Sequence, residues 1–173
     1  MKLLGITIQN DLKWESHVKD IEKRANAKLY MLRSLAKFGL SHEDLITVFI
    51  GYIRPILEYA TPVWSGGLTF AQKERLERIQ KRALRIIFGK EYQSYATALT
   101  RSKLMTLESR WQELCINFFK KTLLCINQFK QFIAQRVHNR SLRKTTKIPE
   151  PRCKTKRMQN SPIPNLIRLY NKN

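Results

Sequence analysis

Apolar side chains recur every three or four residues along most of the chain, which is the spacing of one face of an α-helix. The first such stretch covers residues 14–35 and predicts a helix that Gly39 ends. The second begins at Ser41, in a capping-box-like Ser-His-Glu-Asp sequence, and carries apolar residues from 45 to 57. Pro55 lies inside this stretch, so we expect the helix to be kinked or divided there.

The helical spacing continues through the second half of the chain. Residues 69–88 predict a third helix, which a second capping-box sequence opens and Gly89 closes. Residues 96–104 predict a short helix, and residues 106–137 predict one long helix or two. Only residues 4–8 alternate apolar and small or polar positions with a period of two, which predicts one short strand. The sequence therefore predicts a mainly α fold, a bundle of four to six helices with one short N-terminal β-strand.

The composition of the chain changes near residue 139. Residues 139–173 contain four of the six prolines, no glycine, and ten Lys or Arg against a single acidic residue, Glu150. Residues 1–138 contain 23 basic and 12 acidic side chains. We therefore expect a terminal strand at 1–9, a helical domain at 10–138 and a basic, proline-containing flexible tail at 139–173.

The net charge points to a polyanionic partner. The chain of 173 residues has 33 Lys or Arg against 13 Asp or Glu, a formal net charge of +20. Nucleic acid is the first candidate and an anionic membrane surface the second. No apolar run reaches the roughly 20 residues needed to span a bilayer, and the start of the chain lacks a usable signal-peptide region. We expect an intracellular protein, nuclear or cytoplasmic, without a membrane partner.

Metal-binding and nucleophilic patterns are missing from the sequence. The cysteines at 115, 125 and 153 form no C-x-x-C pair, and the histidines at 17, 42 and 138 have no second ligand at a suitable spacing. No G-x-S-x-G or P-loop glycine pattern occurs. We expect no metal ion and no cofactor in this chain.

Three extended motifs occupy the first half of the chain. They are K-L-L-G-I-T-I at 2–8, Y-I-R-P-I-L-E-Y-A at 52–60 followed by P-V-W at 62–64, and L-E-R-I-Q-K-R-A-L-R-I-I at 76–87. These motifs resemble the K-Y-L-G-V-x-L strand, the Y-x-x-L-I-R-P-I-L-E-Y-x-x-P-V-W signature and the L-E-x-I-Q-x-R-A-L-R-x-I helix of non-LTR (LINE-type, jockey-like) retrotransposon reverse transcriptases. The resemblance covers about half of the chain and falls in the C-terminal, post-palm and thumb-side region of that family.

The resemblance implies a place within a larger enzyme. Residues 1–9 would be a strand from the edge of the palm, and residues 10–138 a thumb-like or connection-like domain. The family's activity, RNA-directed DNA synthesis, uses paired palm aspartates that hold two Mg²⁺ ions. In this chain Asp11, Asp20 and Asp44 stand singly, so we expect no catalytic residue here, no activity of the chain alone, and a palm and fingers encoded upstream of Met1 in the same polyprotein.

A stripe of arginines on the third predicted helix is the first candidate for nucleic-acid contact. Arg75, Arg78, Arg82 and Arg85 share a face that points away from the apolar side, with Lys81 close by. These cations can bind successive backbone phosphates, or they can form a solvated face paired with Glu74 and Glu77. The first helix carries a weaker set, since acidic residues 20 and 22 offset its Lys and Arg.

The tail supplies the second candidate cluster. Its members are Arg140, Arg143, Lys144, Lys147, Arg152, Lys154, Lys156 and Arg157. They form either an electrostatic arm on RNA or DNA, or a solubilising end or nuclear-import signal. The large aromatic residues Trp14, Tyr52, Tyr59, Trp64 and Trp111 lie on or beside apolar helix faces, so core packing is favoured over base stacking.

The leading hypothesis is a C-terminal fragment of a reverse transcriptase that binds template-primer nucleic acid, as RNA, RNA–DNA hybrid or DNA duplex, through phosphate contacts. Two alternatives remain open: a non-functional structural remnant of a decayed mobile element, and a self-standing basic helical nucleic-acid-binding module.

Overall fold

The computed structural model describes residues 1–11, 13–125 and 148–172. It divides the chain into two compact units. The first unit comprises Met1–Ala60 and Leu68–Arg110, and the second comprises Thr61–Gly67 and Trp111–Asn173. The predicted fold class is confirmed, because nearly every described element is a helix and the only strands in the described ranges form a small N-terminal sheet.

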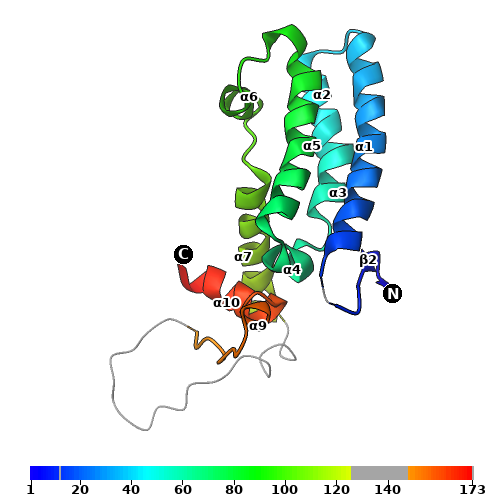
Figure 1. The fold of residues 1–173 in the computed structure, drawn as a ribbon. Coiled ribbons are helices and arrows are strands. Elements are labelled where there is room, and N and C mark those ends of the chain that lie inside the picture. Colours follow the sequence, from blue (N-terminus) through cyan, green and yellow to red (C-terminus); the bar gives the residue numbers. More distant parts are fainter. Residues whose placement is uncertain (12, 126–147, 173) are drawn as a thin grey trace. The chain divides into compact units, whose positions relative to one another are not determined.

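Three helical segments lying side by side form the main body of the first unit (Figure 1). They are α1 (Glu15–Lys37), the run α2 (His42–Val48), η1 (Phe49–Ile53) and α3 (Arg54–Glu58), and α5 (Phe70–Phe88). Their apolar faces form the core, in which Val18, Leu32, Phe49, Leu57 and Leu76 are fully buried. Burial of such side chains stabilises the fold by about 1.5–3 kcal/mol each.

The helix ends follow the predicted capping signals. Ser41 caps α2, its hydroxyl accepting the Asp44 N–H at 3.2 Å. Thr69 and Gln72 form a reciprocal capping box at the start of α5, and Gly89, with a φ of 48°, ends this helix. The Ser41 and Thr69 caps supply partners for amide groups that a helix leaves unpaired at its N-terminus.

The predicted break at Pro55 takes the form of a widened turn. In η1 the chain is π-helical, and the Arg54 N–H bonds to the Phe49 carbonyl five residues earlier. Proline cannot donate an amide hydrogen bond and its ring crowds the preceding turn, which the π-turn accommodates. The extra residue shifts the register, so Tyr52 is 60% exposed. The expectation that Tyr52 packs in the core is therefore wrong.

The predicted N-terminal strand is a hairpin of two short strands. β1 (Lys2–Leu3) pairs antiparallel with β2 (Ile6–Thr7). Leu4 and Gly5 form the turn with φ values of 45° and 81°, and two positive φ angles are what a type I′ hairpin turn requires. The Tyr59 hydroxyl donates to the Leu4 carbonyl at 2.9 Å, and the Tyr59 side chain is half exposed. Tyr59 therefore holds the turn, and the expectation that it packs in the core is wrong.

His17 fixes the hairpin to α1. The Thr7 N–H donates to His17 Nδ1 at 3.4 Å, and the imidazole is buried. Burial disfavours the charged form and lowers the pKa of His17. The contact therefore depends on a neutral imidazole, since only then can Nδ1 accept a hydrogen bond.

A polar cluster joins α5 to α6 (Tyr95–Ser102) and to the start of α7 (Leu107–Cys125). The Gln80 amide donates to Tyr95 Oη and to the Met105 carbonyl, both at 2.9 Å. Glu77 accepts the Tyr95 hydroxyl and, at 3.0 Å, the Leu107 N–H. Burial raises the pKa of Glu77. Glu77 therefore holds the junction of the three helices together and does not belong to an exposed face of paired charges.

The second unit contains α4 (Thr61–Trp64), η2 (Ser65–Gly67), α7 from Trp111 onward, α9 (Lys156–Gln159) and α10 (Pro162–Lys172). Its core consists of Cys115, Phe119, Leu166 and Ile167. The Trp64 and Trp111 rings meet edge to face at 5.3 Å, which confirms their predicted burial.

The described part of the expected flexible tail contains secondary structure. Pro162 occupies the first position of α10, where its missing N–H costs nothing. The apolar residues of α10 then recur at helical spacing and pack against α7. The charge and proline content of residues 139–173 predict a flexible tail, whereas the apolar spacing within α10 predicts a helix. The predicted boundary at 138–139 and the continuation of the long helix to 137 lie outside the described residues.

Candidate nucleic-acid interface

Helices α1 and α5 run parallel, and the order of their contacts along the sequence demonstrates it. Arg75 meets Glu15 and Glu22, whereas Arg82, two turns further along α5, meets Asn26 at 3.5 Å. Residue numbers thus rise in the same direction on both helices, as their colours in Figure 1 also show. The stripe predicted on α5 therefore lies beside one flank of α1.

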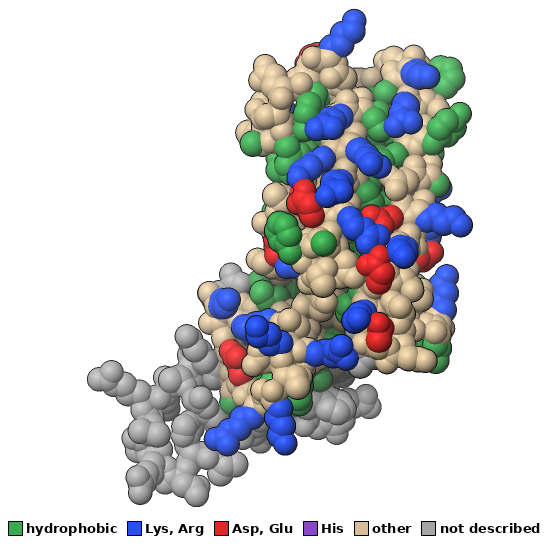
Figure 2. Space-filling view, in the orientation of Figure 1, with side chains coloured by type: hydrophobic (Ala, Val, Ile, Leu, Met, Phe, Trp, Pro, Cys, Tyr) green, Lys and Arg blue, Asp and Glu red, His purple; other side chains and the backbone are tan. Residues whose placement is uncertain are grey.

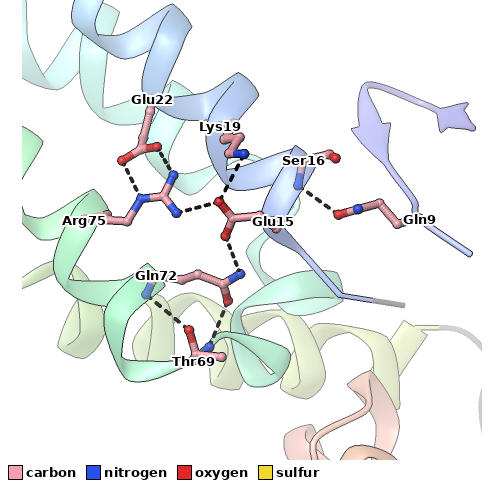
Figure 3. Close-up of polar contacts among 8 residues, drawn as sticks. All are labelled: Gln9, Glu15, Ser16, Lys19, Glu22, Thr69, Gln72 and Arg75. Atoms are coloured by element: carbon pink, nitrogen blue, oxygen red, sulfur yellow. Dashed lines mark hydrogen bonds and ion pairs between the residues drawn. The ribbon is translucent and has the colours of Figure 1, made fainter. Parts of the chain in front are cut away.

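Arg75 is an interhelical clamp (Figure 3). Its Nη1 lies 2.7 Å from Glu15 Oε1, its Nε lies 3.0 Å from Glu22 Oε1, and its Nη2 bonds the other Glu22 oxygen. The Gln72 amide donates to Glu15 Oε2 at 3.1 Å, so the capping box of α5 continues into the same network. The hydrogen bond from Arg75 is the largest cause of the lowered pKa of Glu15, and the pKa of Arg75 is raised.

The clamp changes the charge balance of the first helix. The sequence suggested that acidic residues 20 and 22 offset the basic residues of α1. Asp20 does pair with a basic residue of α1, Arg24, at 3.2 Å, whereas Glu22 pairs with Arg75 of α5. Beyond Glu22, no acidic residue follows in α1, and beyond Glu77 none follows in α5. The stretches 23–37 and 78–88 hold five and four Lys or Arg respectively.

Parallel packing places these two acid-free stretches next to each other. We call the resulting surface the α1–α5 cationic face; its members are Lys23, Asn26, Tyr30, Arg33, Arg78, Arg82 and Arg85. All seven side chains are exposed. Figure 2 shows the Lys and Arg side chains over these helices, with carboxylates gathered nearer their N-terminal ends. None of its five cations takes part in an ion pair with another described residue.

The dimensions of the face suit a nucleic-acid backbone. Arg78 to Arg85 spans about 10 Å along α5, and Lys23 to Arg33 spans about 15 Å along α1, at 1.5 Å per residue. Packed helices lie about 8–10 Å apart, so the face presents two rows of cations. Cations in this arrangement can bind phosphates, and they present few groups for reading base edges.

The other predicted contact residues fall in different surroundings. Lys81 pairs with Glu74 at 2.9 Å and lies 5.3 Å from the Tyr95 ring centroid, on the α6 side of α5. Arg85 stays exposed with its guanidinium 5.4 Å from the Tyr92 ring centroid. Of the arginine stripe, Arg78, Arg82 and Arg85 are exposed and form no ion pair with another described residue, whereas Arg75 pairs with Glu15 and Glu22.

Part of the predicted tail cluster lies in the second unit. Arg152, Lys154, Lys156 and Arg157 are exposed before and within α9. Arg140, Arg143, Lys144 and Lys147 lie outside the described residues. The exposed four form a second cationic region, separate in the sequence from the α1–α5 cationic face.

The aspartates have local structural roles in the described ranges. Asp11 accepts the Lys13 N–H at 3.0 Å, Asp20 pairs with Arg24, and Asp44 takes part in the Ser41 cap. No group of three or more His, Cys, Asp or Glu side chains is arranged to hold a metal ion in the part of the chain that the structure describes. Among the described helices, none combines the length and the apolar character needed to cross a membrane.

The sequence predicts the α1 half of the face only weakly. Its Lys and Arg have acidic neighbours at positions 20 and 22, and no sequence pattern singles out Tyr30. The available signal was the absence of Asp and Glu from the second halves of both helices. Using it required knowing that α1 and α5 pack in parallel.

Comparison with known proteins gives one partial similarity. The chain is 31% identical over 111 residues to the "Probable RNA-directed DNA polymerase from transposon X-element" of Drosophila melanogaster. The match covers 61% of this chain and 12% of that protein, so the chain spans only a small part of its relative. No family model matches the chain, and no solved structure matches it.

Proposed function

We propose that this chain is the post-palm, thumb-side region of a non-LTR retrotransposon reverse transcriptase and that it binds the template-primer through backbone phosphates. The similarity to a transposon RNA-directed DNA polymerase supports the parentage. The α1–α5 cationic face is the observation that carries the binding function. Its five exposed Lys or Arg side chains form no ion pair with another described residue and repel one another, and a bound polyanion would relieve this repulsion.

Binding through this face needs no rearrangement of the helices. The buried seam between α1 and α5 and the Arg75 clamp hold the two cation rows in place. Rigid elements lose little conformational entropy on binding, so the energy of the phosphate contacts is available for affinity. RNA, hybrid and DNA duplex all present phosphates, and the exposed cluster in the second unit adds further contacts to the same class of ligand.

The chemistry of DNA synthesis belongs, in this proposal, to the palm of the longer protein. There Mg²⁺ would align the primer end and the nucleotide phosphates. The part played by this chain is to retain and orient the duplex.

Fluorescence anisotropy with a labelled RNA–DNA hybrid tests the proposal. The variant R78Q/R82Q/R85Q removes three cations from the face. At a slope of about 0.9 per phosphate, each contact contributes about five-fold near 0.15 M salt, so affinity should fall on the order of 100-fold.

A matched control removes the same charge elsewhere. In K2Q/K28Q/K103Q the three lysines are exposed. Lys28 is five residues from both Lys23 and Arg33, and its side chain therefore points about 140° away from theirs. This variant should lose less than about ten-fold. Equal losses in the two folded variants, or no binding by the wild-type chain, would reject the proposed interface.

A further inference from the structure

An exposed tyrosine lies within the α1–α5 cationic face. The Tyr30 side chain is 72% exposed, and its hydroxyl has no hydrogen-bond partner in the described part of the chain. Burying an aromatic ring is strongly favourable, so one this exposed has a large hydrophobic surface available to a ligand. The ring is also flat, so it can stack on another planar group, which an aliphatic side chain cannot do.

The surroundings of Tyr30 follow from the packing of the two helices. Arg82 meets Asn26, so one turn further along each parallel helix the geometry places Tyr30 level with Ile86, the residue after Arg85. Arg33 lies three residues after Tyr30 on the same side of α1, and Lys23 lies seven residues before it. Phosphates bound by these cations would bring their bases near the ring.

Other tyrosines of the first unit are already engaged. The Tyr59 hydroxyl bonds the Leu4 carbonyl, Tyr92 lies beneath the Arg85 guanidinium, and Tyr95 bonds Glu77. Tyr52 is exposed like Tyr30, but it belongs to the π-helical turn and lies outside the two cation rows. It therefore offers a control of the same residue type.

We infer that Tyr30 is a stacking platform for an unpaired base, so that the face binds a duplex next to a single-stranded extension in preference to a blunt duplex. A base inside a duplex is stacked on both sides and cannot use the ring, whereas a base in a single strand has a free face. Stacking on an aromatic side chain raises affinity by about five- to 150-fold per base. This inference rests on the proposed function, because the cations must first hold the strand.

The test compares two ligands, a blunt RNA–DNA hybrid and the same hybrid with a short single-stranded extension. The wild-type chain should bind the extended ligand about ten-fold more tightly. Y30L should lose this preference and keep the affinity for the blunt hybrid, and Y30F should retain the preference because it keeps the ring. Y52L should behave as wild type.

The outcomes separate the two proposals. Absence of binding to both ligands would remove the proposed function itself. Binding that depends on the arginines, but with equal affinity for both ligands or with Y30L indistinguishable from wild type, would overturn only the stacking role. An equal loss in Y52L and Y30L would also overturn it, since the effect would then be unrelated to the cationic face.

Discussion

Replacing Arg75 with methionine should destabilise the first unit although the arginine is on the polar side of α5. The guanidinium bonds two carboxylates, and the exposed fractions of the side chains are 28% for Arg75, 38% for Glu15 and 22% for Glu22. The Glu15 pair is exposed enough to count as a surface ion pair worth about 0.5 kcal/mol. The two-point bond to Glu22 is better shielded and contributes about 1.5 kcal/mol. The total is about 2 kcal/mol, or about 10 °C in Tm for a unit of about 100 residues.

Thermal and urea unfolding followed by circular dichroism measure this effect. Arg78 serves as the matched control, because it is exposed and lacks a described ion-pair partner; R78M should change the free energy of unfolding by less than about 0.5 kcal/mol. A double-mutant cycle with E22Q should give a coupling of about 1.5 kcal/mol. If R75M is no more destabilising than R78M, or if the cycle shows no coupling, Arg75 is an ordinary surface cation and the clamp is refuted.

Three further predictions concern pH, the second unit and catalysis. Because the pKa of His17 is lowered on folding, its contribution to stability is complete above about pH 6.5 and is lost as the pH falls toward the folded pKa. H17N should therefore reduce the slope of the free energy of unfolding against pH in that range. An unchanged slope would contradict the role given to His17. I167A removes a fully buried side chain from the core around Cys115 and Phe119 and should cost about 2–4 kcal/mol in the free energy of unfolding; a loss below about 1 kcal/mol would show that α10 does not pack as described. With primer-template, nucleotides and Mg²⁺ the purified chain should extend no primer, and extension that copurifies with the chain would contradict the division of roles.

Much of the first unit could be predicted from local sequence signals. Helices α1 and α5 follow from apolar spacing, Ser41 marks the start of α2, and Thr69 and Gly89 mark the two ends of α5. These signals act over a few residues and need no knowledge of tertiary contacts. The hairpin was less accessible, since the alternation of residues 4–8 reads as one strand unless the Leu4-Gly5 pair is recognised as a turn.

The candidate interface was predicted only in part, for physical reasons. Whether Arg75 is free depends on Glu15 and Glu22, which lie more than 50 residues away in sequence. The orientation of Tyr52 depends on a π-turn that breaks the assumed helical period. Lys23 and Tyr30 join the arginines only because α1 and α5 run parallel. Such features arise from tertiary packing, which overrides local patterns.

The salt dependence of binding tests the phosphate-contact account most directly. Plotting log affinity for an RNA–DNA hybrid against log salt should give a steep negative slope for the wild-type chain, and R78Q/R82Q/R85Q should flatten it by about 2.7 units, at about 0.9 per phosphate released. K2Q/K28Q/K103Q should leave the slope within about one unit of the wild-type value. If the arginine variant remains folded and keeps the wild-type slope, the α1–α5 cationic face does not contact phosphates.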